Sequence, residues 1–208
     1  MQKQGRENPT SLTGMPRAQV AVLMSDTHAP LPLPSKVAAL HFTALSALVN
    51  AHYACSHGYD LLYLRLTEAT CQHHVYGQRH PSYCKLPAIA HALQRYSTVV
   101  FVDSDAWFTS HAPPLEELIH AGRRTAAASA EHDPSLFLAW DHPYSNGPNC
   151  GFMIWKNSTR AQRLLATWWH IDSGRFNLFH DYEQRTMFWR RGSHNACILL
   201  CACIQCTS

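Results

Sequence analysis

The chain has 208 residues, of which 46% are hydrophobic and 15% are charged, and this composition is typical of one folded domain with a substantial core. Its formal charge of +3 includes no dense basic run, so the sequence does not favour nucleic acid as a partner. No stretch has the roughly 20 apolar residues of a membrane-spanning helix, and residues 1–17 are polar without the apolar centre of a signal peptide. Eight irregularly spaced cysteines do not form the pattern of a disulfide-rich scaffold.

The first third of the chain is predicted to form a strand, a helix and a second strand. Residues 18–24 are a short apolar strand, followed by a loop with three prolines. Apolar residues then recur at steps of three and four over residues 37–49, which predicts a helix with Ser35 as its N-cap. Gly58 is placed to end this helix, and residues 61–64 are expected to be the second strand.

The same alternation continues along the chain. The expected elements are a helix over residues 86–93, a buried strand at 99–102, a helix that opens at 113–114, a candidate strand at 126–130, an apolar segment at 151–155, and a helix over 158–170 whose Trp168 and Trp169 face the core. This order predicts an α/β fold in which helices flank a mostly parallel sheet.

Asp103 and Asp105 come directly after the most apolar strand and are the strongest functional signal in the sequence. Ligand sites in parallel sheets open at the carboxyl ends of the strands. Two aspartates one residue apart on an extended chain point to the same side, where they can share a divalent cation, while Ser104 between them faces away. A bare Asp-x-Asp triplet also fits a solvated turn. The buried strand before it favours Mg²⁺ or Mn²⁺ holding a diphosphate.

Ser25, Asp26 and His28 follow the first strand and allow a second hypothesis, a metal-dependent phosphoesterase. The Asp-x-His triplet is similar to the opening motif of calcineurin-like phosphoesterases, but the Gly-Asp and Gly-Asn-His-Asp/Glu motifs of that family are not in this chain. A haloacid-dehalogenase-like phosphatase with Asp103 as nucleophile has Thr or Val where this chain has Trp107. We therefore expect Ser25 and Asp26 to contact a nucleotide or to cap their loop.

Five separated stretches, in the same order, resemble the glycosyltransferase family of plant xyloglucan α-xylosyltransferases and fungal α-galactosyl- and α-mannosyltransferases. They span roughly residues 20 to 189, and their quoted motifs lie within residues 50–60, 83–89, 103–109, 149–168 and 181–184. The resemblance implies a glycosyltransferase-A (Rossmann-like) fold, a nucleotide-sugar donor such as a UDP-sugar, a glycan acceptor, Mn²⁺ (or Mg²⁺) as cofactor, and retention of anomeric configuration. It also implies a Golgi-lumenal enzyme.

The resemblance also implies roles for individual residues. Asp103 and Asp105 become metal and ribose ligands, and Lys85 becomes the cation beside the diphosphate, although on its own it reads as a surface lysine of a helix. The other donor-binding candidates are Ser25, Asp26, Ser104, Asn149 and Gly151. The resemblance places Glu183 and Gln184 beside the anomeric carbon as catalytic residues, with Asp181 as a competing carboxylate. Without the resemblance, the sequence around these three residues would indicate only an ordinary polar loop or the first turn of a helix.

Residues 190–208 differ in composition from the rest of the chain. Cysteines 197, 201, 203 and 206 lie within ten positions at spacings that do not match a zinc site. The family's strand-end histidine followed by Gly-Cys is expected beyond Gln184, and His194 lacks those neighbours. We therefore expect a polar segment at 1–17, a catalytic domain at 18–189 and an anomalous tail at 190–208. A C-terminally truncated, inactive transferase homologue is the alternative.

Overall fold

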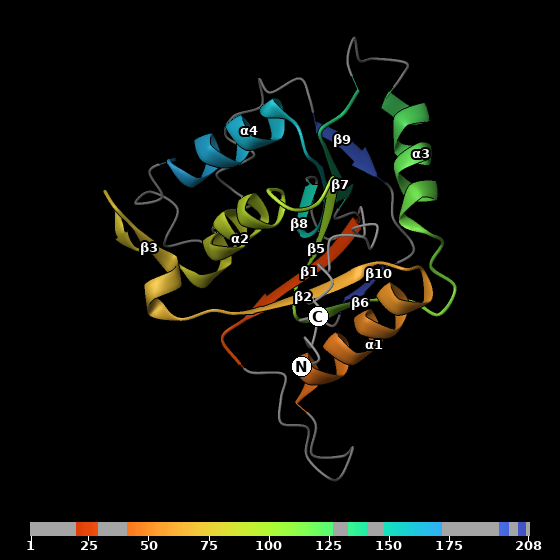
Figure 1. Ribbon diagram of the computed structural model, residues 1–208, viewed down its shortest axis with the longest axis horizontal. Helices are drawn as coiled ribbons and strands as arrows, with labels where there is room; N and C mark the ends of the chain where they lie inside the picture. Colours follow the sequence, from red (N-terminus) through yellow and green to blue (C-terminus); the bar gives the residue numbers. More distant parts are fainter. Residues whose placement is uncertain are drawn as a thin grey trace, which may run out of the picture.

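A computed structural model describes residues 20–28, 41–126, 133–140, 148–171, 196–199 and 204–206. Its centre is a six-stranded sheet with the strand order β2-β1-β5-β8-β7-β9 (Figure 1). The strands are β1 (Val20–Asp26), β2 (Asp60–Arg65), β5 (Thr98–Val102), β7 (Leu136–Trp140), β8 (Pro148–Lys156) and β9 (Ala196–Leu199). Two small sheets accompany it, made by β3 (Gln72–His73) with β4 (Gly77–Gln78) and by β6 (Ala106–Phe108) with β10 (Ile204–Cys206).

The central sheet is mostly parallel, as the alternation of elements predicted. β1 pairs in parallel with both β2 and β5, and β7 pairs in parallel with β9. β8 lies between β5 and β7 and is antiparallel to both. The carboxyl end of β5 therefore lies beside the amino end of β8, so residues from both ends meet at one edge of the sheet.

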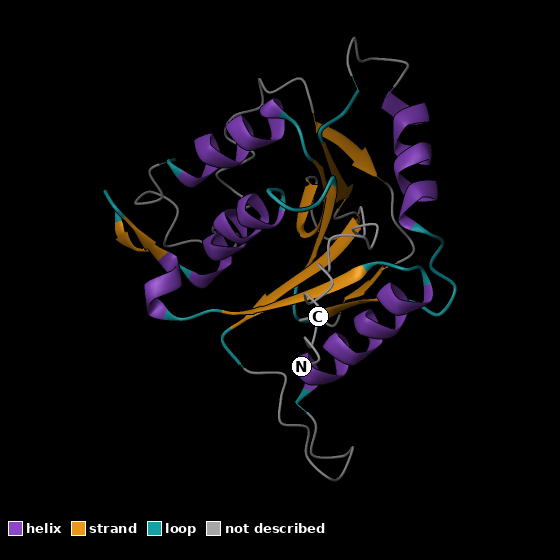
Figure 2. Ribbon diagram, in the orientation of Figure 1, coloured by secondary structure: helices purple, strands orange, loops and turns teal. Residues whose placement is uncertain are grey.

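Helices cover both faces of this sheet (Figures 1 and 2). α1 (Phe42–Ser56) and α3 (Leu115–Ala126) pack on one face, and α2 (Lys85–Ala92) and α4 (Thr159–Trp169) pack on the other. Strand alternation explains how β5 serves both layers, since Val100 and Val102 join the cluster under α1 while Val99 and Phe101 join the cluster under α2 and α4. Continuous apolar runs are the expected sequence of such two-sided strands.

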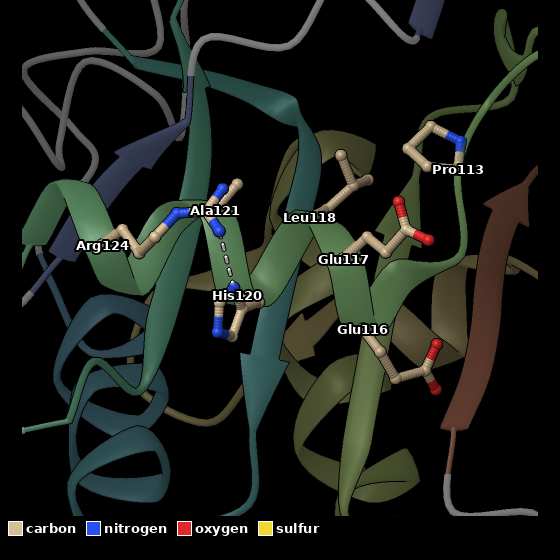
Figure 3. Close-up of a pocket in the computed structure, with 7 residues that line it drawn as sticks. All are labelled: Pro113, Glu116, Glu117, Leu118, His120, Ala121 and Arg124. Carbon is tan, nitrogen blue, oxygen red and sulfur yellow. Dashed lines mark hydrogen bonds between the residues drawn. The ribbon is translucent and has the colours of Figure 1, made fainter.

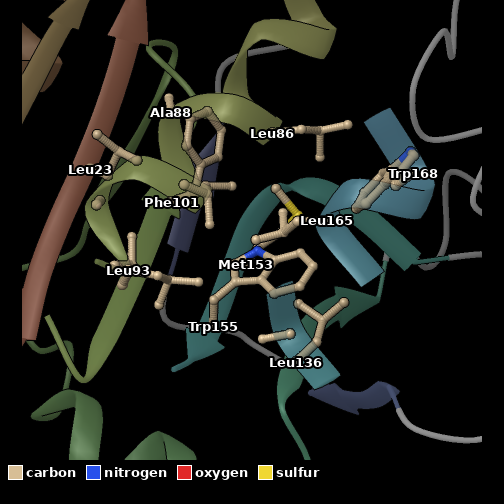
Figure 4. Packing of buried hydrophobic residues seen from close by; sticks show 14 of the residues in the cluster. Leu23, Leu86, Ala88, Leu93, Phe101, Leu136, Met153, Trp155, Leu165 and Trp168 are labelled. Carbon is tan, nitrogen blue, oxygen red and sulfur yellow. The ribbon is translucent and has the colours of Figure 1, made fainter. Parts of the chain in front are cut away.

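The cluster under α2 and α4 contains the largest buried side chains of the described residues. Trp155 of β8 is fully buried and Trp168 of α4 is 2% exposed, with ring centroids 6.4 Å apart (Figure 4). Phe101 and Leu86 pack into the same cluster. The prediction that Trp168 belongs to the core is confirmed, whereas Trp169 is only partly buried at its edge.

The helix and strand boundaries confirm most of the predicted elements and correct two of them. α1 begins at Phe42 after an extended His41, so Ser35 is not its N-cap. Gly58, with φ +70°, follows its end as predicted. The strand expected at residues 126–130 is wrong at its start, because α3 continues through Ala126; the next described strand begins at Leu136. Residues 127–130 of this expected strand lie outside the described residues.

Two short strands fall within residues 190–208, the segment expected to be an anomalous tail. β9 is the edge strand beside β7, and β10 pairs with β6, which directly follows the Asp103–Asp105 turn. None of the helices that the structure describes combines the length and apolarity needed to span a bilayer.

Candidate active site

A pocket of about 170 Å³ opens at the carboxyl ends of β1 and β5. Because these strands are parallel neighbours, their ends bring together residues from two separate parts of the sequence. The pocket is lined by Ser25, Asp26, Thr27, Leu66, Pro81, Ser82, Lys85, Asp103 and Ser104. Five of the predicted donor-site or metal-site residues thus share one pocket.

Lys85 and Asp103 form a partly buried ion pair in the wall of this pocket. Lys85 is the first residue of α2, and its side chain is 5% exposed. Its Nζ donates to Asp103 Oδ1 at 2.9 Å and to the carbonyl of Cys150 at 3.2 Å, and it lies 4.9 Å from the centre of the Phe101 ring. An ammonium group this far from water needs such partners. Lys85 is therefore not a surface lysine.

The amino end of β8 forms the other side of the Asp103 carboxylate. The backbone N–H of Asp103 donates to the carbonyl of Gly151 at 2.8 Å, and the N–H of Gly151 donates to Asn149 Oδ1 at 2.6 Å. A Cβ on Gly151 would lie 2.8 Å from both Asp103 Oδ2 and Asn149 Oδ1. Glycine is thus required here because two polar oxygens approach its backbone closely.

Asp26 closes the pocket from the end of β1. Burial alone would raise the pKa of this carboxyl group, but hydrogen bonds with Ser104 and His28 outweigh it and hold the pKa below its usual value. His28 contributes both its backbone N–H at 2.7 Å and its ring Nδ1 at 2.8 Å from Asp26 Oδ1. The Asp-x-His triplet therefore forms a local loop cap around an anionic carboxylate.

The Asp103–Asp105 turn differs from the extended geometry expected from the sequence. The strand ends at Val102, and residues 104 and 105 lie in a turn. Ser104, which alternation would have faced away, lines the pocket and hydrogen-bonds with Asp26. Asp105 is partly exposed and is not among the lining residues of the pocket. The two carboxylates thus belong to one turn but do not share one strand face.

Polar side chains of helix α1 hydrogen-bond to the backbone of this turn and of the strand that follows it, and the sequence did not predict these contacts. Ser46 Oγ donates to the carbonyl of Ser104 at 2.6 Å. The buried Asn50 donates to the carbonyl of Ala106 and accepts from the N–H of Phe108, each at 3.0 Å. A buried side chain that satisfies two backbone groups fixes their positions. Polar residues within an otherwise apolar helical stripe were the available signal.

The donor atoms around Asp103 suit a hard divalent ion. Carboxylate oxygens of Asp103 and Asp105, the amide oxygen of Asn149 and the hydroxyl of Ser104 are the ligand types that Mg²⁺ and Mn²⁺ take. Asp103 Oδ2 and Asn149 Oδ1 both lie 2.8 Å from the position that a Cβ on Gly151 would take, so these two oxygens face the same small space. The residues present therefore fit the predicted ion. The catalytic candidates Asp181, Glu183 and Gln184, and His194, lie outside the described residues.

A disulfide that the sequence analysis did not predict lies next to the pocket. Cys71 and Cys84 are bonded, and they join two single 3-10 turns, Glu68–Cys71 and Pro81–Cys84. Cys84 directly precedes Lys85, and the second turn supplies Pro81 and Ser82 to the pocket wall. The disulfide therefore fixes the start of α2. Its two cysteines have no spacing that distinguishes them from the other six, so the sequence held no usable signal.

The hairpin of β3 and β4 is attached to the end of α4 by histidine and arginine side chains. The buried His73 lies 2.9 Å from His170, Nε2 to Nδ1. The guanidinium group of Arg79 lies about 5 Å from the ring centres of Tyr76, Tyr83 and Trp169 and donates to the carbonyl of Ile171 at 2.5 Å. These contacts hold the chain just before the segment that carries Asp181, Glu183 and Gln184.

His73, His74 and His170 have ring nitrogens within 4.8 Å of one another, as three metal ligands would. The hydrogen bonds argue against an ion there. His73 Nδ1 accepts from the backbone N–H groups of Val75 and Tyr76 at 3.0 and 3.1 Å, so the ring proton is on Nε2 and is donated to His170. Metal at Nε2 would replace this proton and leave the ring anionic. His73 and His170 therefore form a hydrogen bond that joins the β3–β4 hairpin to the end of α4.

A second pocket, of about 440 Å³, lies along α3 (Figure 3). Two of its charged side chains have partners on the protein itself: Glu116 accepts from the hydroxyl of Tyr59 at 2.5 Å, and Arg124 lies 3.0 Å from His120 Nδ1. Burial, together with the nearby Glu116 carboxylate, raises the pKa of Tyr59. Polar groups do not converge on one point here, in contrast to the pocket at Lys85 and Asp103.

Comparison with known proteins identifies the family. The sequence profile of the galactosyl transferase GMA12/MNN10 family matches residues 20–199. No curated protein sequence matches the chain. The crystal structure of a glycosyltransferase involved in the glycosylation of the major capsid of PBCV-1 has a similar fold, with a TM-score of 0.55 and 13% identity over 87% of this chain and 82% of that one. GlyE of Streptococcus pneumoniae TIGR4, also a glycosyltransferase, gives a TM-score of 0.47 and 12% identity over 88% of this chain and 45% of that one.

Proposed function

The chain belongs to the galactosyl transferase GMA12/MNN10 family and is a glycosyltransferase, and from this premise we propose that it transfers a hexose or pentose from a UDP-sugar to a glycan acceptor with retention of configuration. Mn²⁺, or Mg²⁺ in its place, is the proposed cofactor. The acceptor class is that of α-galactosyl-, α-mannosyl- and xyloglucan α-xylosyltransferases. The family membership is also why we prefer a transferase to a phosphoesterase.

The observation that carries this proposal is the polar pocket at the carboxyl ends of β1 and β5. An ammonium group, Lys85, and two carboxylates, Asp26 and Asp103, face a volume of about 170 Å³ whose remaining polar lining is mainly serine hydroxyls. A cation beside carboxylates, one of which is the proposed metal ligand Asp103, suits a diphosphate, and hydroxyl groups suit its ribose and phosphate oxygens. The apolar pockets of small neutral ligands have a different lining.

The proposed mechanism follows from where negative charge develops. When the sugar leaves its donor, charge accumulates on the diphosphate, and Lys85 stabilises that charge because its ammonium is already desolvated and fixed. Divalent metal ions supply Lewis-acid charge to the same leaving group. Asn149 and Gly151 would line the sugar's position beside Asp103. Glu183 and Gln184, with Asp181 as the competing carboxylate, remain the proposed groups beside the anomeric carbon.

We further propose that the enzyme works in the Golgi lumen. The Cys71–Cys84 disulfide supports an oxidising compartment, because disulfides persist there and are rare in the cytosol. The family resemblance supports the same location.

Calorimetric titration with UDP tests the donor site. UDP is expected to bind with Mn²⁺ present and to lose about 10-fold or more of its affinity in excess chelator or after Asp103→Ala or Asp105→Ala. Asp133→Ala is the matched control, because Asp133 pairs with Arg123 and Lys156 away from the pocket. Equal UDP affinity with Mn²⁺ and with chelator would remove the metal-dependent donor site from the proposal.

A further inference from the structure

The ion pair between Lys85 and Asp103 has a consequence for the order in which ligands bind. Lys85 Nζ lies 2.9 Å from Asp103 Oδ1, so one oxygen of the candidate metal ligand already faces a positive charge. The ammonium is nearly excluded from water, with 5% of its side chain exposed, whereas the side chain of Asp103 is 37% exposed. Of the pair, the carboxylate is therefore the partner that an incoming ion reaches.

A divalent cation that binds Asp103 alone would share its carboxylate with this ammonium. Like charges a few ångströms apart repel one another, and the repulsion is weakly screened where water is excluded. Lys85 also cannot simply withdraw, because its nitrogen is held by the carbonyl of Cys150 at 3.2 Å and lies against the ring of Phe101. The ion pair therefore lowers the affinity of the empty pocket for a free metal ion.

A nucleoside diphosphate changes this balance. Its phosphate oxygens bring several negative charges into the pocket that Lys85 and Asp103 both line. The diphosphate can then neutralise the ammonium, and the metal ion can bridge Asp103 and the phosphates. Each ligand thus removes the charge repulsion that disfavours the other, and such coupling is reciprocal by thermodynamic necessity.

We propose, resting on the donor site proposed above, that Lys85 makes metal binding conditional on the nucleotide. In the metal-free protein it neutralises Asp103, and in the loaded protein it is the counter-ion of the diphosphate. Removing its charge should therefore have opposite effects on two ligands: free metal should bind more tightly and the nucleotide more weakly. A residue that merely holds the fold together would weaken both.

The experiment measures Mn²⁺ affinity with and without saturating UDP in the unaltered chain and in Lys85→Met, which preserves side-chain length without charge. In the unaltered chain UDP is expected to tighten Mn²⁺ binding by about 10- to 100-fold. In Lys85→Met, Mn²⁺ alone should bind several-fold more tightly and UDP with Mn²⁺ at least about 10-fold more weakly, so that the tightening of Mn²⁺ binding by UDP is several-fold smaller than in the unaltered chain. Lys85→Arg keeps the charge and should keep the coupling.

Lys156→Met is the matched control, because it removes a lysine from an ion pair with Asp133 at the far end of β8. It should leave both affinities unchanged. Unaltered or weaker binding of free Mn²⁺ to Lys85→Met, with UDP still bound in the presence of Mn²⁺ by the unaltered chain, would overturn this inference and leave the donor site standing. If the unaltered chain binds no UDP at all, both proposals fail. Should Lys85→Met not fold, equal Mn²⁺ affinity of the unaltered chain with and without UDP overturns the inference and, because coupling is reciprocal, the metal-dependent donor site with it.

Discussion

Replacing Gly151 with alanine is the sharpest structural test of the pocket. The new Cβ would lie 2.8 Å from Asp103 Oδ2 and from Asn149 Oδ1, whereas ordinary contacts begin at 3.4 Å, so each oxygen must move by about 0.6 Å. The β8 backbone cannot yield, because Gly151 accepts the N–H of Asp103 across the sheet at 2.8 Å. The displacement therefore falls on the two side chains.

The expected size of the effect follows from which oxygen moves. Asp103 is held by Lys85, so its carboxylate must either break that bond or rotate out of position for a metal ion. Misplacement of a ligand by somewhat under 1 Å should reduce affinity for UDP with Mn²⁺, and kcat/KM for sugar transfer, by about 10- to 100-fold. Crowding a packed position should also cost about 1 to 3 kcal/mol of unfolding free energy.

Gly58→Ala separates these two effects. Gly58 has φ +70°, so alanine there is strained by about 1 to 2 kcal/mol, but nothing lies within 4 Å of the new Cβ. Both variants should melt several degrees lower in thermal denaturation, about 2–4 °C per kcal/mol for a chain of this size. Only Gly151→Ala should lose UDP binding in calorimetry. Normal UDP binding by Gly151→Ala, or an equal loss in Gly58→Ala, would refute the geometric argument.

Three further outcomes are expected. Burial, with Arg79 and two histidines nearby, lowers the pKa of His73. The neutral His73 ring therefore stabilises the fold above its unfolded pKa of about 6.5, and this stabilisation is lost as pH falls below that value, at up to about 1.4 kcal/mol per pH unit. Between pH 7 and 5.5 the melting temperature of His73→Phe should fall less than that of the unaltered chain, and an identical fall would contradict a buried, neutral His73 bonded to His170. Cys71→Ser with Cys84→Ser should lower the unfolding free energy by about 2 to 4 kcal/mol in denaturant titration and weaken UDP binding, whereas unchanged binding would show that the disulfide does not position Lys85. Trp168→Ala, at a site 2% exposed, should cost about 3 to 5 kcal/mol, and a change of under 1 kcal/mol would mean that the cluster repacks.

The sequence predicted the layers of the fold because its signals are local. A strand covered on both faces is a continuous apolar run, as residues 99–102 are, and a helix end with φ above zero is marked by Gly58. The Asp103 region was found for the same reason, since a polar group directly after a buried strand must lie at the sheet edge. The start of the strand expected after α3 was wrong because alanine, as at Ala126, fits either kind of element, and the strand Leu136–Trp140 was not predicted.

The sequence could not predict the pairings between distant residues. Lys85 and Cys150 are separated by 65 positions, and Asn50 and Ala106 by 56, so only the folded topology brings them together. The disulfide has the same character. The orientation of Ser104 was missed for a different reason: alternation holds within a strand, and the chain leaves the strand before this residue.

The antiparallel placement of β8 makes the site sensitive to the strand's length in single-residue steps. Val102 pairs with Phe152, which sets Gly151 beside Asp103. Side chains alternate along a strand, so an insertion or deletion of one residue between Gly151 and the strand's buried middle would exchange the two faces and bring Cys150 or Phe152 toward the carboxylate. A change of two residues would restore the face. Relatives that keep the activity should therefore differ in this stretch by substitutions or by even-numbered length changes, and an odd-numbered change should coincide with loss of the acidic turn.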